Sequence, residues 1–394
     1  MLKILTFLGL GPEKGYKTTT YIKHDKSKSF QTHLFPDAVT NLYNPDQTIV
    51  FVTPKVEEDE KGYLKFLIEK IEKLDSKLKV ESIPDGNSEN DLWNIFQKCA
   101  DTVNENDKII LDITHAFRSI PLLIFIVAAY LRQVKNIQLK HIIYGAFEAR
   151  NSEKNETPIF DLTPFVELLD WMNAVNVFQN YGDARPIASL NVDPKMKNTL
   201  NSLSDALLTS RTLAAQKAAM TFNGLPFGDS QQPPFQMLID QLKQSYQQMA
   251  VHEPHKKKEP TLKEQYFQIK WYVENQHYLQ AITLMREWLI SWECRNGQGH
   301  WLSYSKRKKV EEMLKEQVEN RDTQITQQLA QIAQQLNMDV TTIELWDQCV
   351  DIRNDLAHCG MRITPEPKSA TDAIQGIQNL FNEFEKFVHK NNIA

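Results

Sequence analysis

Residues 1–165 alternate short apolar runs with amphipathic segments, and this alternation constrains the fold more than any other feature of the sequence. Apolar runs of strand length, each bounded by glycine, proline or polar residues, cover residues 3–8, 49–53, 78–83, 108–113 and 140–146. Helical spacing separates them at residues 63–74, at 88–103 and from Pro121 onward. Strands separated by helices need crossover connections, so neighbouring strands run parallel and helices cover both faces. We therefore predict an α/β domain built on a mostly parallel sheet.

Two loops follow predicted strands at the sheet edge where such domains bind ligands. The first is Gly9-Leu10-Gly11, whose backbone amides are candidate donors. This loop lacks the third glycine and the following helix of a dinucleotide-binding loop, because residues 16–23 include three successive threonines and favour an extended segment. A nicotinamide cofactor is therefore excluded, and we expect no cofactor of another kind.

The second loop follows residues 108–113 and contains Thr114, His115 and Arg118. A hydroxyl, an imidazole and a guanidinium directly before a helix N-terminus suit a phosphate group. The alternative is that Asp112 and Thr114 cap the turn while Arg118 pairs with a carboxylate. The combination favours a ligand site that includes both loops.

A second candidate site is the segment Arg353-Asn354-Asp355-Leu356-Ala357-His358. It follows an apolar-periodic run at residues 343–352 and precedes Gly360, so we expect it at the C-terminal end of a helix. Arginine offers a fixed fork of donors to phosphate, and histidine exchanges a proton near neutrality. These groups suit RNA cleavage without a metal, in which the 2′-hydroxyl attacks and a cyclic phosphate remains. The alternative is a surface cation and a cap.

The spacing within this segment limits how its side chains can meet. Asn354 and His358 are four residues apart and share a helix face, whereas Arg353 and His358 diverge by about 140°. One regular helix does not bring Arg353 to His358. We expect convergence at a helix end, or from a second copy across a two-fold axis.

Composition places the chain among globular proteins of two domains. It has 394 residues and a formal net charge of -5, which disfavours a protein coated in positive charge. Short basic runs at residues 255–258 and 306–309 either guide RNA or are simply solvated. The four cysteines form no C-x-x-C pair, so neither a zinc site nor a disulfide framework is expected, and no metal is predicted. Cys359, beside His358, is predicted to be a small apolar filler and not a nucleophile.

No export or membrane segment is expected. The first residues, MLKILTFLGLG, lack a signal-peptide cleavage pattern, and the apolar run at residues 121–131 is too short to span a membrane. We expect a cytoplasmic protein without membrane contact.

The middle of the chain is predicted to be helical. Pro164 opens a helix that we interpret as the connection between the domains of the two candidate sites, with an apolar packing stripe of Phe165, Leu168, Leu169, Met172, Val175 and Val177. Further helices are predicted at residues 198–220 and 235–251, and Gln-rich residues 324–335 keep helical spacing.

Several motifs together resemble a known family. The order FLGLG, GYKTTTY, IILDITHAFRSIP, IIYGAFEA and PIFDLTPF is similar to the CARF sensor domain of CARF–HEPN ribonucleases, and it covers about residues 1–165. Ala116 replaces a glycine that is more usual there. The segment Arg353 to His358 resembles the R-N-x-x-x-H signature of HEPN ribonucleases, and QAITLMREWLISW at residues 280–292 resembles the first long HEPN helix.

The resemblance implies three parts: a Rossmann-like CARF domain at residues 1–164, a helical connector at 165–260 and an all-α HEPN domain at 261–394. It implies a homodimer that binds a cyclic oligoadenylate made by a type III CRISPR complex and then cleaves single-stranded RNA. Arg353, Asn354 and His358 are the expected catalytic residues. Two other classes are a non-catalytic nucleotide sensor, whose helical part only dimerises or binds a partner, and a transcription factor. The acidic balance and the lack of a basic helix-turn-helix disfavour the last.

Overall fold

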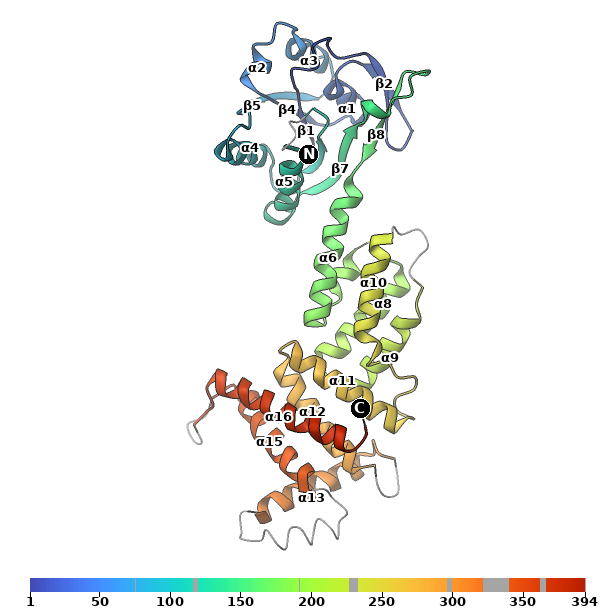
Figure 1. The fold of residues 1–394 in the computed structure, drawn as a ribbon, viewed down its shortest axis with the longest axis vertical. Helices are drawn as coiled ribbons and strands as arrows, with labels where there is room; N and C mark the ends of the chain where they lie inside the picture. The colour runs from blue at the N-terminus through green and yellow to red at the C-terminus, as the bar shows by residue number, and fades with distance from the viewer. Residues whose placement is uncertain are drawn as a thin grey trace. The chain divides into compact units, whose positions relative to one another are not determined.

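The computed structural model describes residues 1–74, 76–115, 120–190, 192–226, 233–295, 300–321, 340–361 and 366–393. The chain forms two compact units, Met1–Leu169 and Asp170–Ala394 (Figure 1). The finer division predicted at residues 164 and 260 stays a prediction.

An eight-stranded sheet organises the first unit, in the order β3-β2-β8-β7-β6-β1-β4-β5. The strands are β1 (Leu2–Phe7), β2 (Thr19–Ile22), β3 (Ser29–Thr32), β4 (Gln47–Val52), β5 (Lys77–Ser82), β6 (Lys108–Asp112), β7 (Gln138–Gly145) and β8 (Glu156–Asp161). The strands β7, β6, β1, β4 and β5 are parallel, whereas β8 is antiparallel to β7 and β3 is antiparallel to β2. The predicted α/β domain with a mostly parallel sheet is confirmed.

Helices cover both faces of this sheet, as the alternation predicts (Figure 1). On one face, α4 (Glu89–Asp101) and α5 (Ile120–Val134) pack on apolar side chains of the central strands. On the other, α1 (Phe35–Tyr43) and α3 (Tyr63–Ile71) do the same, with the short α2 (Pro54–Glu57) beside them. The Ser88 hydroxyl caps α4 by accepting the Asp91 N–H at 3.1 Å. The carboxyl ends of β1, β6 and β7 therefore share one edge, which is where the candidate ligand loops lie.

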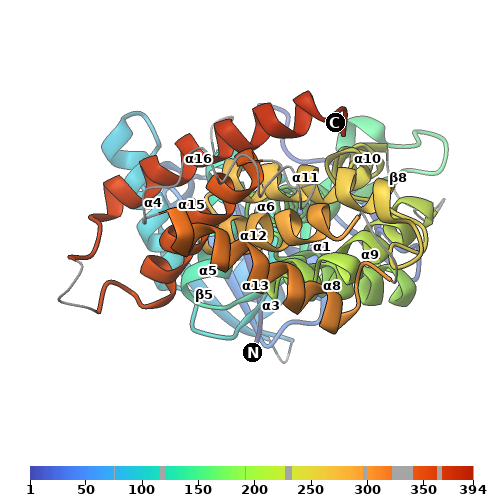
Figure 2. The same ribbon diagram turned by 90° about the horizontal axis from the view of Figure 1, so that it is seen from below.

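The second unit is helical in its described part, and Figure 2 shows its helices from below. After α6 (Thr163–Tyr181), which crosses the boundary between the units, its helices are α7 (Arg185–Ser189), α8 (Pro194–Leu208), α9 (Thr212–Gly224), α10 (Pro233–Gln247), α11 (Lys258–Glu274), α12 (Tyr278–Glu293), α13 (Tyr304–Arg321), α15 (Val340–Ala357) and α16 (Ala370–Lys390). Helix α12 packs against α11 and α15, and α15 packs against α16. The Gln-rich residues 324–335 lie outside the described residues. Among those described, no helix is long and apolar enough to cross a membrane.

Two helix predictions need correction. The single helix predicted at residues 198–220 is divided into α8 and α9, because Ser210 adopts a left-handed conformation with φ 54° and ends the first helix. The helix predicted at residues 235–251 ends at Gln247.

The apolar stripe predicted on α6 is also partly wrong. Phe165 is 64% exposed and Met172 is 50% exposed. Val175 is buried as predicted, and the other buried side chains of this helix are Val166, Trp171, Ala174 and Phe178. Apolar residues occur all around α6, so periodicity alone selected a neighbouring face.

Candidate ligand and cleavage sites

A cavity of about 700 Å³ opens at the carboxyl ends of β1, β6 and β7. Three residues predicted from the sequence line it: Gly11, Thr114 and His115. Gly9 and Leu10 belong to the same loop but are not part of the lining, and Arg118 lies outside the described residues. The cavity occupies the position that the fold class favours for a ligand.

The first loop is built around the ring of Tyr16. The Tyr16 hydroxyl donates to the Gly9 carbonyl at 3.0 Å, and its ring centroid lies 4.9 Å from that of Tyr63 and 4.7 Å from that of His115. Gly11 has φ +70°, and a Cβ there would lie 2.8 Å from the Tyr16 ring. Only glycine therefore fits this turn without displacing Tyr16. Burial raises the pKa of Tyr16 to about 12, so its hydroxyl remains a donor.

The second loop begins with a buried carboxylate. Asp112 Oδ1 accepts the Thr114 N–H at 2.8 Å, and its Oδ2 accepts the Thr6 hydroxyl at 2.5 Å. Burial raises the pKa of Asp112 to about 6, although these hydrogen bonds oppose the shift. The Thr114 hydroxyl accepts the Gly145 N–H at 2.9 Å and so joins the ends of β6 and β7. Thr114 thus caps the turn, as the alternative interpretation expects, and also lines the cavity.

His115 presents a neutral imidazole to this site. Burial lowers its pKa to about 4, because the imidazolium would be poorly solvated there. Its Nε2 is buried and has no hydrogen-bond partner among the described residues. An unpaired buried nitrogen is costly unless a ligand supplies the partner. His115 is therefore available to a ligand as a neutral donor or acceptor.

Most of the remaining cavity lining was not assigned from the sequence. It comprises aromatic rings, two lysines and acidic side chains, namely Tyr16, Tyr21, Tyr144, Phe147, Lys14, Lys17, Glu13 and Glu148, together with Pro12, Gly15, His33 and Gly145. The Glu148 carboxylate accepts the Tyr144 hydroxyl at 2.8 Å. The signal for most of these residues lies in GYKTTTY and IIYGAFEA, where aromatic residues, lysines and glycines follow the predicted strands. Rings stack on nucleobases and lysines pair with phosphates, so the lining suits a nucleotide.

The second candidate site lies at the end of α15. This helix ends at Ala357, and the His358 N–H still donates to the Asn354 carbonyl at 3.0 Å. Cys359 and Gly360 then turn the chain with φ 54° and 67°. Arg353 and Asn354 are half-buried and His358 is exposed. Within the described part of the chain, no hydrogen bond or ion pair joins these three side chains.

Cys359 differs from its prediction. It is exposed and adopts a left-handed conformation in the turn, so it does not fill the core. The turn that follows α15 carries it into solvent, which helix periodicity alone does not indicate.

A network of charges holds the helices next to this site. The Arg286 guanidinium on α12 is paired with Glu287 and with Glu311 on α13, and it lies 5.6 Å from the ring centroid of Trp346 on α15. Glu287 also accepts from Arg307 on α13 at 2.7 Å. Arg286 is 9% exposed, and its contacts join α12, α13 and α15.

The two basic runs are partly used inside the fold. Arg307 donates to Ser291 at 2.7 Å as well as to Glu287, and Lys308 lies 3.7 Å from Glu312. In the other run, Lys256 pairs with Glu253 at 2.6 Å. These contacts reduce the charge that either run can offer to RNA.

Comparisons with known proteins agree with the fold of the first unit. Residues 3–148 match the family model described as CRISPR system endoribonuclease Csx1, CARF domain, and residues 167–253 match CRISPR-associated protein MJ1674, second domain. The CRISPR-associated protein MJ1674 of Methanocaldococcus jannaschii is 33% identical over 159 residues, which are 38% of this chain and 25% of that protein. The predicted resemblance of the first 165 residues is confirmed: the first unit carries a CARF domain.

A solved structure was also compared. Enterococcus italicus Csm6 bound to cyclic hexa-2'-fluoro-hexa-dAMP aligns over 97% of this chain and 93% of that chain, with 10% sequence identity and a TM-score of 0.49.

Proposed function

We propose that this chain is a metal-independent endoribonuclease of type III CRISPR defence in the cytoplasm, activated by a cyclic oligoadenylate. The observation that carries the proposal is a nucleotide-suited cavity in a CARF domain, in the same chain as an Arg-Asn-x-x-x-His segment at an exposed helix end. The cavity supports ligand sensing, and the segment supports RNA cleavage.

The ligand class follows from the cavity lining. Tyr16, Tyr144 and Phe147 offer rings for stacking on bases, and Lys14 and Lys17 offer charge to phosphates. A carboxylate such as Glu148 repels phosphate but accepts from the exocyclic amino group of adenine. Together these groups favour an adenine nucleotide over an inorganic or purely apolar ligand.

The ligand's size favours a homodimer. The cavity of one chain holds about 700 Å³, within the range of pockets that enclose one drug-sized molecule. A ring of four or six adenylates is larger and has rotational symmetry. Two copies of the cavity on a two-fold axis would match both its size and its symmetry. The same axis would also bring the Arg353–His358 segments of the two chains together. One chain alone does not bring Arg353 to His358.

The proposed reaction uses the chain's own residues. His358 accepts the proton of the RNA 2′-hydroxyl, whose oxygen attacks the adjacent phosphorus while the bond to the 5′-oxygen breaks. Arg353 stabilises charge on the non-bridging oxygens, and Asn354 orients His358 from the same helix face. The products carry a 2′,3′-cyclic phosphate and a 5′-hydroxyl. The leaving 5′-oxygen takes its proton from a second His358 or from water.

The test uses the full chain with labelled single-stranded RNA and cyclic oligoadenylates of different ring size. We expect one ring size to activate cleavage, with cyclic phosphate ends on the products and no reaction at a 2′-deoxy position. His358→Ala and Arg353→Ala should each abolish cleavage while binding the activator as the wild type does. Tight activator binding without any cleavage by the wild type would instead support the non-catalytic sensor.

A further inference from the structure

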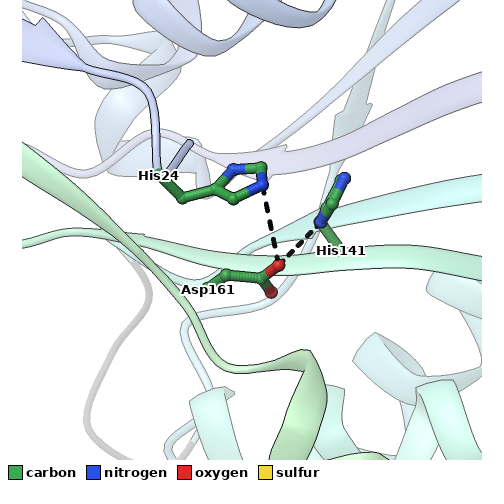
Figure 3. A group of neighbouring side chains, drawn as sticks. All are labelled: His24, His141 and Asp161. Atoms are coloured by element: carbon green, nitrogen blue, oxygen red, sulfur yellow. Dashed lines mark hydrogen bonds and ion pairs between the residues drawn. The ribbon is translucent and has the colours of Figure 1, made fainter. Parts of the chain in front are cut away.

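Three side chains of types that can bind a metal ion converge in the first unit, and none of them lines the cavity (Figure 3). His24 follows β2, His141 lies on β7 and Asp161 ends β8. His141 Nδ1 lies 2.8 Å from Asp161 Oδ2, and His24 Nε2 lies 3.9 Å from the same oxygen. Within the described part of the chain, this is the one group of three or more histidine, cysteine or acidic side chains whose donor atoms lie within 4.8 Å of one another.

His24 is held as a metal ligand would be. Its Nδ1 lies 2.8 Å from the Tyr43 hydroxyl, which leaves Nε2 directed at Asp161. A hydrogen bond of this kind on the second ring nitrogen is the usual support of a ligating histidine, because it fixes the tautomer and the ring orientation. Burial and the neighbouring His141 lower the pKa of His24.

Asp161 supplies the negative charge. Burial raises its pKa, but hydrogen bonds from His141 and Thr163 outweigh this effect and hold the pKa of the carboxyl below its usual range. Its Oδ1 is occupied by the Thr163 N–H at 3.0 Å and by the Thr163 hydroxyl. Its Oδ2 therefore remains for the two imidazoles. The three side chains are 20–29% exposed, so an ion can reach them.

We propose that His24, His141 and Asp161 bind a divalent transition metal ion, and that Zn²⁺ is the ion best suited to this donor set. Two imidazoles and one carboxylate are zinc ligands, with water in the fourth position. Tetrahedral zinc with bonds of 2.0–2.1 Å separates its donors by about 3.3 Å. The two distances to Asp161 Oδ2, 2.8 and 3.9 Å, lie on either side of this value. Small side-chain movements therefore suffice to form the site.

Binding requires one change of proton position. Without metal, His141 Nδ1–H donates to Asp161, and this hydrogen bond holds the two side chains together. With metal, His141 presents the Nδ1 lone pair and carries its proton on Nε2, while His24 Nδ1–H donates to the Tyr43 oxygen. Burial raises the pKa of Tyr43, so its hydroxyl does not ionise and compete for the ion.

The ion would join segments that are far apart in the sequence. β2 carries Tyr21 and β7 carries Tyr144, both in the cavity lining, and His24 and His141 lie three residues from them. Asp161 lies two residues before α6, and its Oδ1 accepts the N–H and the hydroxyl of Thr163, the first residue of that helix. A bound ion would thus fix the sheet edge on which the cavity and the start of α6 both depend.

The experiment measures metal binding to the full chain after dialysis against a chelator. We expect about one equivalent of Zn²⁺ per chain by calorimetry and a visible absorption band of tetrahedral Co²⁺ in its place. His24→Ala and His141→Ala should each weaken Zn²⁺ binding by at least tenfold and remove the Co²⁺ band. Tyr43→Phe keeps all three ligands and should weaken binding about tenfold, as loss of a supporting hydrogen bond does.

Asp25→Asn is the matched control, because it removes a neighbouring exposed carboxylate that pairs with Lys23 and acts on His24 only through its charge, not as a ligand. It should lose far less Zn²⁺ affinity than His24→Ala. Equal affinity in the wild type and His24→Ala, or an unchanged affinity in both His141→Ala and Tyr43→Phe, would overturn the site. None of these measurements involves oligoadenylate or RNA, so their failure leaves the proposed ribonuclease function intact.

Discussion

The turn at Gly11 allows a prediction whose size follows from the structure. Gly11→Ala would place a Cβ 2.8 Å from the Tyr16 ring at a φ of +70°. A left-handed conformation costs a residue with a Cβ about 1–2 kcal/mol, and forcing a group into an occupied space costs about 1–3 kcal/mol. The lower entropy of the unfolded alanine chain returns about 0.4–1 kcal/mol. We expect a net loss of about 3 kcal/mol.

Gly62 separates these contributions. It has φ +71°, and nothing lies within 4 Å of a Cβ built there. Gly62→Ala should therefore cost only about 1 kcal/mol, from backbone conformation alone. Gly224→Ala adds a Cβ in open space without a positive φ, so it should carry only the gain of about 0.4–1 kcal/mol from the unfolded chain.

The assay is hydrogen exchange of the β1 amides, which are protected by pairing with β4 and β6. A loss of about 3 kcal/mol speeds exchange by roughly a hundredfold, against about fivefold for 1 kcal/mol. A cycle with Tyr16→Ala tests the clash directly, because Gly11→Ala should cost no more than Gly62→Ala once the ring is removed. Equal effects of Gly11→Ala with and without the ring would refute the assigned contact.

The remaining predictions concern ligand, catalysis and pH. Arg118→Ala, at a position outside the described residues, should weaken activator binding by about 1.5–3 kcal/mol in calorimetry and leave the cleavage site intact, because a charge-assisted bond to phosphate is lost. Heterodimers of His358→Ala with wild type, isolated with two tags, should lose far more than half of the RNA-cleavage activity. If each wild-type chain kept the activity of one full site, a site shared between the chains would be contradicted. Chelators should not stop RNA cleavage. If a chelator slows cleavage by removing Zn²⁺ from the proposed site, it should have no such effect on His24→Ala, which lacks that site. His115 titrates near 6.5 when unfolded but has a pKa of about 4 when folded, so its contribution to stability is present above pH 6.5 and lost as the pH falls toward 4. Lowering the pH from 7.5 to 5 should therefore reduce the free energy of unfolding, measured with urea, by about 2 kcal/mol. His115→Gln should lack that part of the pH dependence.

The central fold could be predicted because its signals are local. Short apolar runs bounded by polar residues, such as Ile109 to Leu111, favour buried strands, and the Ser88 cap marks the start of α4. The β2–β3 hairpin was not predicted, because β3 is four residues long and only Thr32 in it is fully buried. The hairpin joins the sheet because β2 pairs with β8, a contact across more than 130 residues of sequence.

The candidate-site residues could likewise be predicted only where their sequence signal is local. Thr114 and His115 could be selected because they follow a predicted strand, and the structure places both in the cavity lining. Phe147 follows the predicted strand at residues 140–146 and could have been selected in the same way, whereas Tyr21 reaches the cavity through the pairing of β2 with β8, which no spacing in the sequence encodes. His24, His141 and Asp161 likewise lack any ligand spacing and meet through strand pairing.

The bonds around β7 explain how occupation of the cavity can affect α6. At one end of β7, the Gly145 N–H donates to Thr114 in the cavity wall at 2.9 Å. Three residues earlier on the same strand, the Ile142 N–H donates at 2.9 Å to the Thr163 hydroxyl in the first turn of α6. Between them, Ile143 is aligned with Asp161, whose carboxylate accepts the Thr163 N–H at 3.0 Å. A ligand that repositions the end of β7 therefore acts on the start of α6 through a short and continuous set of hydrogen bonds. Such contacts transmit activation only if the ligand binds one arrangement of β7 more tightly than the other, since equal affinity for both would shift nothing.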